Sequence, residues 1–145
     1  MSQELLVTLG AGRRVTAHFE GFAIETDQST EHGGEGSAPQ PFDLFLASIG
    51  ACAGAYISGF CAPRGIPVDG VRIVQSWDRA ANHNLTRIAL RIELPETFPD
   101  KYRDAIARVV DKCSVKRTLA SRPRRTDCAG ARPVSGTQRC AGRRC

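Results

Sequence analysis

The chain has 145 residues, of which 41% are hydrophobic and 24% are charged. This length suits one domain with or without a tail, and the composition excludes a collagen-like or wholly disordered chain. The formal net charge of +5 comes from residues 121–145, which hold seven arginines, no lysine and one acid, Asp127. The other 120 residues carry 13 basic and 14 acidic groups, so the body of the chain lacks the positive charge typical of nucleic-acid-binding domains.

The N-terminus and the cysteines indicate a reducing compartment. The first ten residues, MSQELLVTLG, lack a basic stretch followed by an apolar one, so no secretory signal is visible. We therefore expect a cytoplasmic protein. Six cysteines in such a protein are more often catalytic, metal-binding or buried than paired in structural disulfides.

The N-terminal third predicts a β meander. Residues 4–9 include the apolar Leu5, Leu6, Val7 and Leu9, and apolar and polar residues alternate over 13–26, with a turn at residues 10–12 between the two segments. Residues 27–40, DQSTEHGGEGSAPQ, form a polar, Gly-rich loop. Because this loop is long for a compact domain, we expect it to be either mobile or functional.

Residues 41–62 predict a long helix that is apolar on every face. Pro41 suits the first helical position and Asp43 the first turn, and no charge follows until Arg64. The 19 uncharged residues 44–62 are also long enough to span a bilayer. We favour a buried central helix, because strand patterns on both sides supply a sheet to cover it and small residues weaken the insertion signal.

A hairpin and a second helix follow. Val71, Ile73 and Trp77 share one strand face, and Ile88, Leu90, Ile92 and Leu94 share a face of the next strand, with residues 80–84 as the turn. Residues 99–113 predict an amphipathic helix. The segment 121–145 has one large aliphatic residue, Val134, and is predicted to be irregular or disordered. The organisation is thus α+β, with one domain over 1–120 and an atypical tail over 121–145.

Two of the cysteines lie on predicted apolar helix faces. Cys52 is in the middle of the first helix, and Cys113 is at the end of the second, so they can meet if both helices pack on one sheet. Cys61 lies nine residues after Cys52, which on one helix means about 13.5 Å along the axis and roughly half a turn around it. These two therefore cannot form a disulfide while that helix is intact.

Two segments resemble the motifs of the OsmC/Ohr family. Residues 41–52, PFDLFLASIGAC, followed by Arg64-Gly65-Ile66, are similar to the first-cysteine motif of that family. Residues 112–119, KCSVKRTL, are similar to its second-cysteine motif. The separation of the two cysteines and the order of the predicted elements also agree with the family over residues 1–120.

The resemblance implies an OsmC-like fold and a thiol peroxidase that needs no metal or haem cofactor. It implies an intertwined homodimer with the long helices buried between subunits. Cys52 matches the peroxidatic cysteine, which attacks an organic hydroperoxide and becomes a sulfenic acid, and Cys113 matches the resolving cysteine. An external dithiol would then reduce the Cys52–Cys113 disulfide.

The resemblance also implies a cation beside the reactive thiol. An apolar site raises the pKa of a thiol, and members of the family supply an arginine from the meander, which here is Arg13 or Arg14. The glutamate that assists this arginine in the family is replaced here by Phe42. We expect an apolar substrate site lined by Phe42, Phe45, Ile49 and Tyr56. The family closes with a β-strand after the second motif, and the tail contains no such pattern, being either a divergent extension or a different reading frame.

The sequence also bears on metal binding, on nucleic-acid binding and on a non-catalytic role. No C-x-x-C or H-x₃₋₅-H spacing occurs, so no metal site is predicted, although Cys128, Cys140 and Cys145 could form one in the tail. The tail arginines would attract phosphate, but no aromatic residue accompanies them for base stacking, so we expect no nucleic-acid partner. The main alternative is a non-catalytic OsmC-like stress or small-molecule-binding protein in which both cysteines are structural.

Overall fold

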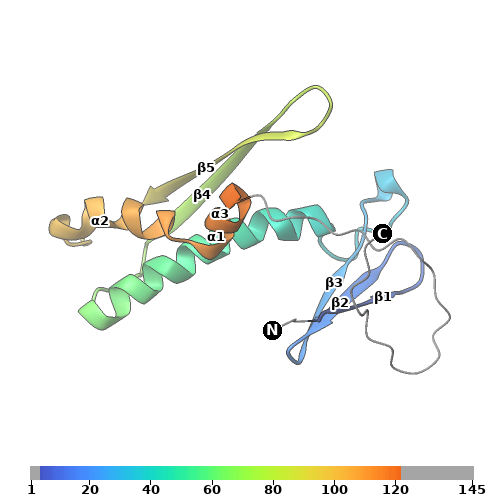
Figure 1. Ribbon diagram of the computed structural model, residues 1–145, viewed down its shortest axis with the longest axis horizontal. Coiled ribbons are helices and arrows are strands. Elements are labelled where there is room, and N and C mark those ends of the chain that lie inside the picture. Colours follow the sequence, from blue (N-terminus) through green and yellow to red (C-terminus); the bar gives the residue numbers. More distant parts are fainter. Residues whose placement is uncertain (1–3, 122–145) are drawn as a thin grey trace.

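The computed structural model describes residues 4–121 (Figure 1). The tail predicted over 121–145, including Cys128, Cys140 and Cys145, lies outside these residues apart from Ser121. Five strands, three α-helices and two short 3₁₀ helices occur in the described part of the chain. The α+β class expected from the sequence is therefore confirmed.

The predicted meander is a three-stranded antiparallel sheet in the order β1-β2-β3. Its strands are β1 (Leu6–Leu9), β2 (Val15–Phe19) and β3 (Phe22–Thr26). Phe19 pairs with Phe22 across a two-residue turn, in which Glu20 and Gly21 both have positive φ, as this tight turn requires. The meander lies beyond the N-terminal end of the long helix, apart from the hairpin and the other helices (Figure 1).

The buried Asp27 organises the loop 27–40 that follows the meander. Its carboxylate accepts hydrogen bonds from the backbone N–H groups of Gln28, Glu35 and Ser37 and from the Ser37 hydroxyl, at 2.8–3.1 Å. Gly34 is required because a Cβ there would lie 2.0 Å from the Gln28 carbonyl oxygen. The loop is thus built around one carboxylate and includes the short 3₁₀ helix η1 (Thr30–His32).

The long helix is α1 (Pro41–Cys61), and it begins where the sequence predicts. Pro41 is the first helical residue, and the Asp43 carboxylate accepts a hydrogen bond from the backbone N–H of Gln40, the N-cap. The chain leaves α1 through the 3₁₀ helix η2 (Ala62–Arg64) and turns at Gly65, which has a φ of 62°.

The predicted hairpin consists of β4 (Arg72–Arg79) and β5 (Leu85–Glu93). Their register pairs Ile73 with Ile92 and Trp77 with Ile88, so the predicted apolar residues share the face turned toward α1. The opposite face carries charged residues. On that face Glu93 forms ion pairs with Arg72 and Arg91, which hold the pKa of its carboxyl below the usual range although partial burial raises it.

The predicted second helix is divided in two. It comprises α2 (Asp100–Asp111) and α3 (Ser114–Ser121), and Cys113 lies between them instead of ending one helix. The sequence analysis did not predict α3. The closing strand typical of the family does not follow α2 within the described residues, where α3 takes the chain to Ser121.

The core forms where α1, α2 and the hairpin meet. α1 buries one stripe along its length: Leu46, Ile49, Ala53, Ile57 and Cys61. The last three of these pack with Ile106 and Val110 of α2. Their spacing of three or four residues places them on one side of the helix.

The rest of α1 is not buried within one chain, which differs from the expectation of a helix covered on every face. Small residues, among them Ala47, Ala51 and Ala55, lie exposed along the side away from the core. The segment Pro41–Arg64 is also long and apolar enough to cross a membrane, and 28% of its most apolar window is buried. A single subunit therefore leaves an apolar helix surface without a cover.

Candidate functional site

The structure brings Cys52 and Cys113 together. They are 61 positions apart in the sequence, and the Cys52 side chain forms a hydrogen bond with Cys113. Cys52 is partly exposed on α1, whereas Cys113 is fully buried, at 0% exposure. The two sulfur atoms are thus adjacent, and only one of them is open to solvent.

The break between α2 and α3 positions Cys113. The Cys113 N–H donates to the Val110 carbonyl at the end of α2, and the Cys113 carbonyl accepts from Arg117 in α3. Cys113 therefore occupies the position just before the first residue of α3, where the backbone N–H groups of Val115 and Lys116 reach its side chain.

Opposing effects act on the pKa of the Cys113 thiol. Burial raises this pKa because it disfavours the charged sulfur. The hydrogen bond from Cys52, those from the backbone of Lys116 and Val115, and the charge of Lys116 all lower it. The net result is a Cys113 pKa below the ordinary value of 9.0.

Side chains around the thiol pair connect α1, α2 and α3. The Tyr56 hydroxyl lies 3.0 Å from the Ser114 hydroxyl and so links α1 to the start of α3. Lys116 Nζ donates to Asp111 Oδ1 at 2.6 Å, which bridges α3 to the end of α2. These contacts hold the segment that carries Cys113 against the helix that carries Cys52.

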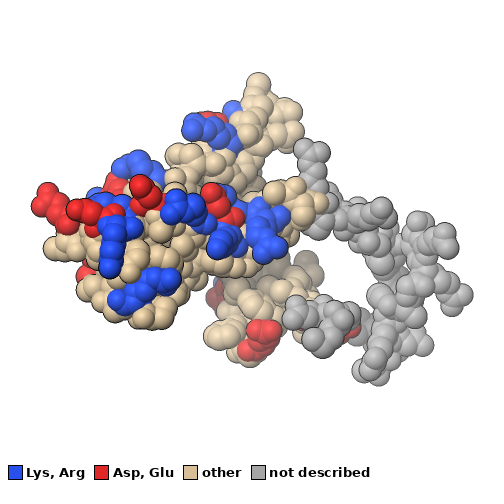
Figure 2. Space-filling model, turned by 60° about the vertical axis from the view of Figure 1, so that its left-hand side comes forward, with Lys and Arg blue, Asp and Glu red and all other residues tan. Residues whose placement is uncertain are grey.

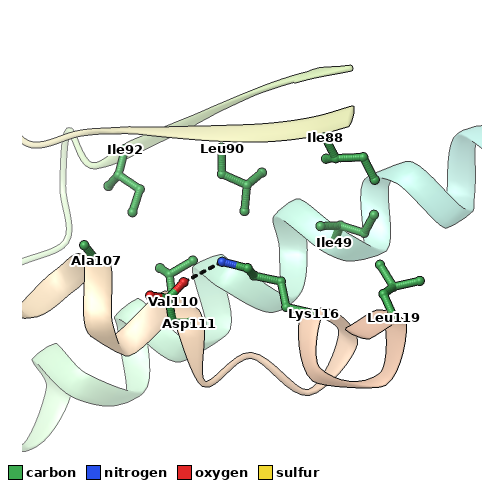
Figure 3. A pocket seen from close by; sticks show the side chains of 9 residues that line it. All are labelled: Ile49, Ile88, Leu90, Ile92, Ala107, Val110, Asp111, Lys116 and Leu119. Carbon is green, nitrogen blue, oxygen red and sulfur yellow. Dashed lines mark hydrogen bonds and ion pairs between the residues drawn. The ribbon is translucent and has the colours of Figure 1, made fainter. Parts of the chain in front are cut away.

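An apolar cavity lies next to this segment (Figure 3). Its volume is about 350 Å³, it is partly open to solvent, and side chains of α1, β5, α2 and α3 line it. The lining residues are Ile49, Ile88, Leu90, Ile92, Ala107, Val110, Asp111, Lys116 and Leu119. Figure 3 shows the β5 side chains facing the helices across the cavity, with the Lys116–Asp111 ion pair among the apolar groups. This size and lining are typical of sites for small apolar molecules.

The four predicted substrate residues do not line one cavity. Ile49 lines the cavity, and Tyr56 bonds to α3. Phe42 and Phe45 lie in the first two turns of α1, with ring centroids 5.6 Å apart and exposures of 38% and 36%, and they do not line the cavity. Phe42 also lies beneath the Arg79 guanidinium, 4.5 Å away. The sequence predicted an apolar site but missed the β5 side chains that form much of its wall.

The two candidate arginines contact the loop 27–40. Arg14 Nη1 lies 3.9 Å from Glu35 Oε2, and Arg13 lies beside Gly33. Both belong to the meander, which lies away from α3 (Figure 1). The charged group identified beside Cys113 is Lys116, a residue of the second motif that the sequence analysis did not single out.

Cys61 is separate from the thiol pair, as the helix geometry predicts. It is fully buried in the core with Ile57 and Phe98. Burial raises the pKa of its thiol, although the Arg64 charge opposes this. Cys61 is therefore a packing residue, and it supplies a control for experiments on Cys52.

Gln75 is a second polar residue that the sequence analysis missed. It lies on the inner face of β4, and its Nε2 donates to the Leu46 carbonyl of α1 at 2.9 Å. A Cβ on Gly50 would approach the Gln75 Oε1 atom to 3.1 Å, so Gly50 allows this close contact. The small residues of α1 thus allow the hairpin to pack closely on it.

No group of three or more metal-ligating side chains occurs within residues 4–121. On the face seen in Figure 2, basic and acidic side chains are interspersed rather than gathered by sign. Within residues 4–121, the thiol pair and the apolar cavity are thus the features that could support a chemical function.

Solved structures share this arrangement of strands and helices. A Psychrobacter arcticus protein assigned to osmotic stress and detoxification responses has a TM-score of 0.69 and 21% identity, covering 81% of this chain and 88% of its own. An OsmC like protein from Mycoplasma pneumoniae has a TM-score of 0.66 and 19% identity, covering 83% of this chain and 88% of its own. The organic hydroperoxide resistance protein OsmC of Legionella pneumophila has a TM-score of 0.55 and 19% identity, covering 81% of this chain and 89% of its own.

These likenesses define the fold as an OsmC-type α+β fold. The family model for OsmC-like proteins matches residues 34–126, which is more than half of the chain. The chain therefore belongs to the OsmC family, and the resemblance inferred from the two cysteine motifs is confirmed. None of the curated proteins compared with the chain matches it.

Proposed function

We propose that this protein is a thiol peroxidase that reduces organic hydroperoxides through Cys52 and Cys113. The contact between the two thiols carries this proposal, because a disulfide requires two sulfurs within bonding reach. Partial exposure of Cys52 supports its assignment as the sulfur that meets the peroxide. Full burial of Cys113 supports its assignment as the resolving sulfur, shielded from direct oxidation.

The reaction takes three steps. The Cys52 thiolate attacks the terminal peroxide oxygen, the O–O bond breaks, and an alcohol leaves while Cys52 becomes a sulfenic acid. The Cys113 sulfur then attacks the Cys52 sulfur and displaces water, giving the disulfide. An external dithiol reduces this disulfide by thiol–disulfide exchange and restores both thiols.

The apolar cavity supports an organic substrate. Its lining by Ile88, Leu90 and Ile92 favours the hydrocarbon part of a hydroperoxide over water. Ile49 lies one helical turn before Cys52, so a molecule in the cavity lies close to the helix segment that carries the reactive sulfur.

We also propose a cytoplasmic homodimer. The exposed small residues of α1 allow a second helix to approach closely. Leu6, Leu9 and Phe22 of the meander are 64%, 86% and 68% exposed, which leaves another apolar surface to cover.

A peroxidase assay tests the proposed activity. Purified protein with cumene hydroperoxide and dithiothreitol is expected to turn over, and Cys52→Ser is expected to abolish turnover because it removes the attacking sulfur. Cys61→Ala is the matched control, since it removes a thiol from the same helix outside the pair, and it should keep the activity. Full activity in Cys52→Ser would contradict the proposal.

A small-molecule-binding protein without catalysis is the second candidate, and the cavity is the observation that favours it. Mass spectrometry after peroxide treatment separates the two candidates. A peroxidase forms the Cys52–Cys113 disulfide in proportion to the peroxide added. A protein that binds a ligand without turnover leaves both thiols reduced.

A further inference from the structure

We propose that Tyr56 is a positioning residue for the resolving step: its hydroxyl holds Ser114, and through Ser114 the adjacent Cys113, in place for the attack on the Cys52 sulfur. Tyr56 acts through Ser114, so it is not itself a catalytic residue. This role rests on the proposed function where the oxidant is a peroxide. The closure of the Cys52–Cys113 disulfide, which Tyr56 assists, can also be measured without peroxide.

The spacing of residues on α1 and α3 places Tyr56 beside the thiol pair. Tyr56 follows Cys52 by four residues, so the two side chains lie on the same side of α1, about one turn apart. Ser114 follows Cys113 directly and is the first residue of α3. The 3.0 Å contact between the Tyr56 and Ser114 hydroxyls therefore joins the same two segments of the chain that carry the two cysteines.

Hydrogen bonding, more than burial, attaches α3 to α1. No residue of α3 is buried. Within residues 4–121, the Tyr56–Ser114 contact is the side-chain hydrogen bond that joins α1 to α3. Lys116 donates to Asp111 at 2.6 Å, which ties α3 to α2 instead of to α1. Because core packing does not fix α3, loss of either hydroxyl is expected to loosen the first turn of α3 relative to α1.

Disulfide formation makes a strict demand on the position of this turn. The two sulfurs must come to about 2 Å from each other, with their Cβ atoms about 3.8 Å apart. Cys52 lies in the middle of a 21-residue helix, whereas Cys113 lies in the break between α2 and α3, so the Cys113 segment is the one that can move. A hydrogen bond from α1 to the next residue keeps this segment near Cys52 and so reduces the ordering that closure requires.

Closure can be followed with dithiodipyridine, an aromatic disulfide whose released thiopyridone absorbs light. The Cys52 sulfur attacks one sulfur of the reagent, breaks its S–S bond, releases one thiopyridone and keeps the other half as a mixed disulfide. The Cys113 sulfur then attacks the Cys52 sulfur, forms the Cys52–Cys113 bond and releases the second thiopyridone. The reagent thus takes up the two electrons and two protons that the thiols lose. The first phase of release reports the reactivity of Cys52, and the second reports closure.

Tyr56→Phe and Ser114→Ala each remove one partner of the hydrogen bond. Both are made in the full-length chain carrying Cys128→Ser, Cys140→Ser and Cys145→Ser, and one equivalent of reagent is added. Each is expected to leave the first phase unchanged and to slow the second by about threefold, the factor for a weak hydrogen bond, since water can reach both hydroxyls. The double variant should be no slower than the single ones, because both changes remove the same contact.

Two further variants separate positioning from a general loss of structure. Ser114→Thr keeps a hydroxyl at the same place and should restore the second phase to the rate of the parent chain. Tyr102→Phe is the matched control, because Tyr102 is the other tyrosine of the chain and its ring packs on Phe60 at 5.7 Å between centroids. It should leave both phases unchanged.

The outcomes separate this inference from the proposed function. A second phase that is unchanged in Tyr56→Phe, or slowed only in step with the first, would overturn the inference, as would a double variant in which the two losses multiply. A parent chain without a second phase would also overturn it, because Tyr56 would then have no closure to assist. Selective slowing of the second phase supports the inference even if cumene hydroperoxide is not turned over, a result that would contradict the peroxidase alone.

Discussion

At the scale of single residues, the proposed function makes the cavity lining the feature that selects among oxidants. Ile88 projects from β5 into the cavity opposite the helices (Figure 3). Its replacement by tryptophan would fill much of a volume of about 350 Å³. Ile88 lies on the hairpin, whereas both thiols lie on helical segments, so such a change alters substrate space and leaves the sulfur contact in place.

We therefore expect Ile88→Trp to lower kcat/KM for cumene hydroperoxide by about tenfold, a change of about 1.4 kcal/mol in the activation free energy. Hydrogen peroxide should be much less affected, because it has no hydrocarbon group to place in the cavity. Steady-state assays with both oxidants measure this difference. Val74→Trp, on the outer face of β4, is the control and should leave kcat/KM for both oxidants unchanged. Equal losses of kcat/KM for both oxidants in Ile88→Trp would show that the cavity does not hold the substrate.

At the scale of elements, the loop 27–40 depends on the charge of Asp27. The backbone N–H of Ser37 makes the largest contribution in lowering the pKa of this carboxyl from 3.8 to about 2, although burial opposes the shift. The native state thus binds its proton more weakly than the unfolded chain does. Asp27 therefore stabilises the fold above about pH 4, and this contribution is lost as the pH falls toward 2.

Asp27→Asn is expected to lower the melting temperature by several degrees at neutral pH. In the wild type, Asp27 Oδ1 accepts a hydrogen bond from the Gln28 N–H, and Oδ2 accepts from the N–H groups of Glu35 and Ser37. An asparagine would place an NH₂ group, which is itself a donor, against at least one of these N–H donors. Thermal melts at neutral pH and at pH 2 provide the test. The difference in melting temperature between Asp27→Asn and the wild type should be smaller at pH 2 than at neutral pH. An equal difference at both pH values would contradict the assigned role. Glu25→Gln, on the exposed side of β3, is the control and should change the melting temperature little.

At the scale of the whole molecule, the proposed homodimer depends on the uncovered surfaces of α1 and the meander. A homodimer in which α1 packs against its copy predicts that Ala55→Glu gives a monomer, because a charge would be buried against the partner helix. Light scattering coupled to gel filtration measures the mass. Ser76→Glu, on the exposed outer face of β4, is the control and should remain dimeric.

Two results would contradict this arrangement. A dimer that persists in Ala55→Glu would show that the α1 surface is not the interface. A wild-type protein that stays in solution only with detergent would favour the membrane-spanning interpretation of Pro41–Arg64. Either result would leave the contact between Cys52 and Cys113 unchanged, since that contact lies within one chain.

Local patterns in the sequence determined most of the elements. Alternation over 13–26 and 71–94, together with Pro41 and Asp43 at the start of a long apolar run, predicted the meander, the hairpin and the start of α1. These signals are local, because strand alternation and helix capping depend on residues a few positions apart. The two cysteine motifs likewise indicated the family before any fold was known.

Contacts between distant residues had to be decided by the tertiary structure. The break between α2 and α3 places Cys113 before a helix N-terminus. The sequence predicted one helix over 99–113 that ends at Cys113, and it predicted no helix after it. The β5 wall of the cavity, the position of Lys116 beside the thiols and the contact of Arg14 with Glu35 depend on how elements pack. The sequence alone thus singled out Cys52 and Cys113. Packing decided that these cysteines lie together and which side chains surround them, because residues far apart in a chain meet only through the fold.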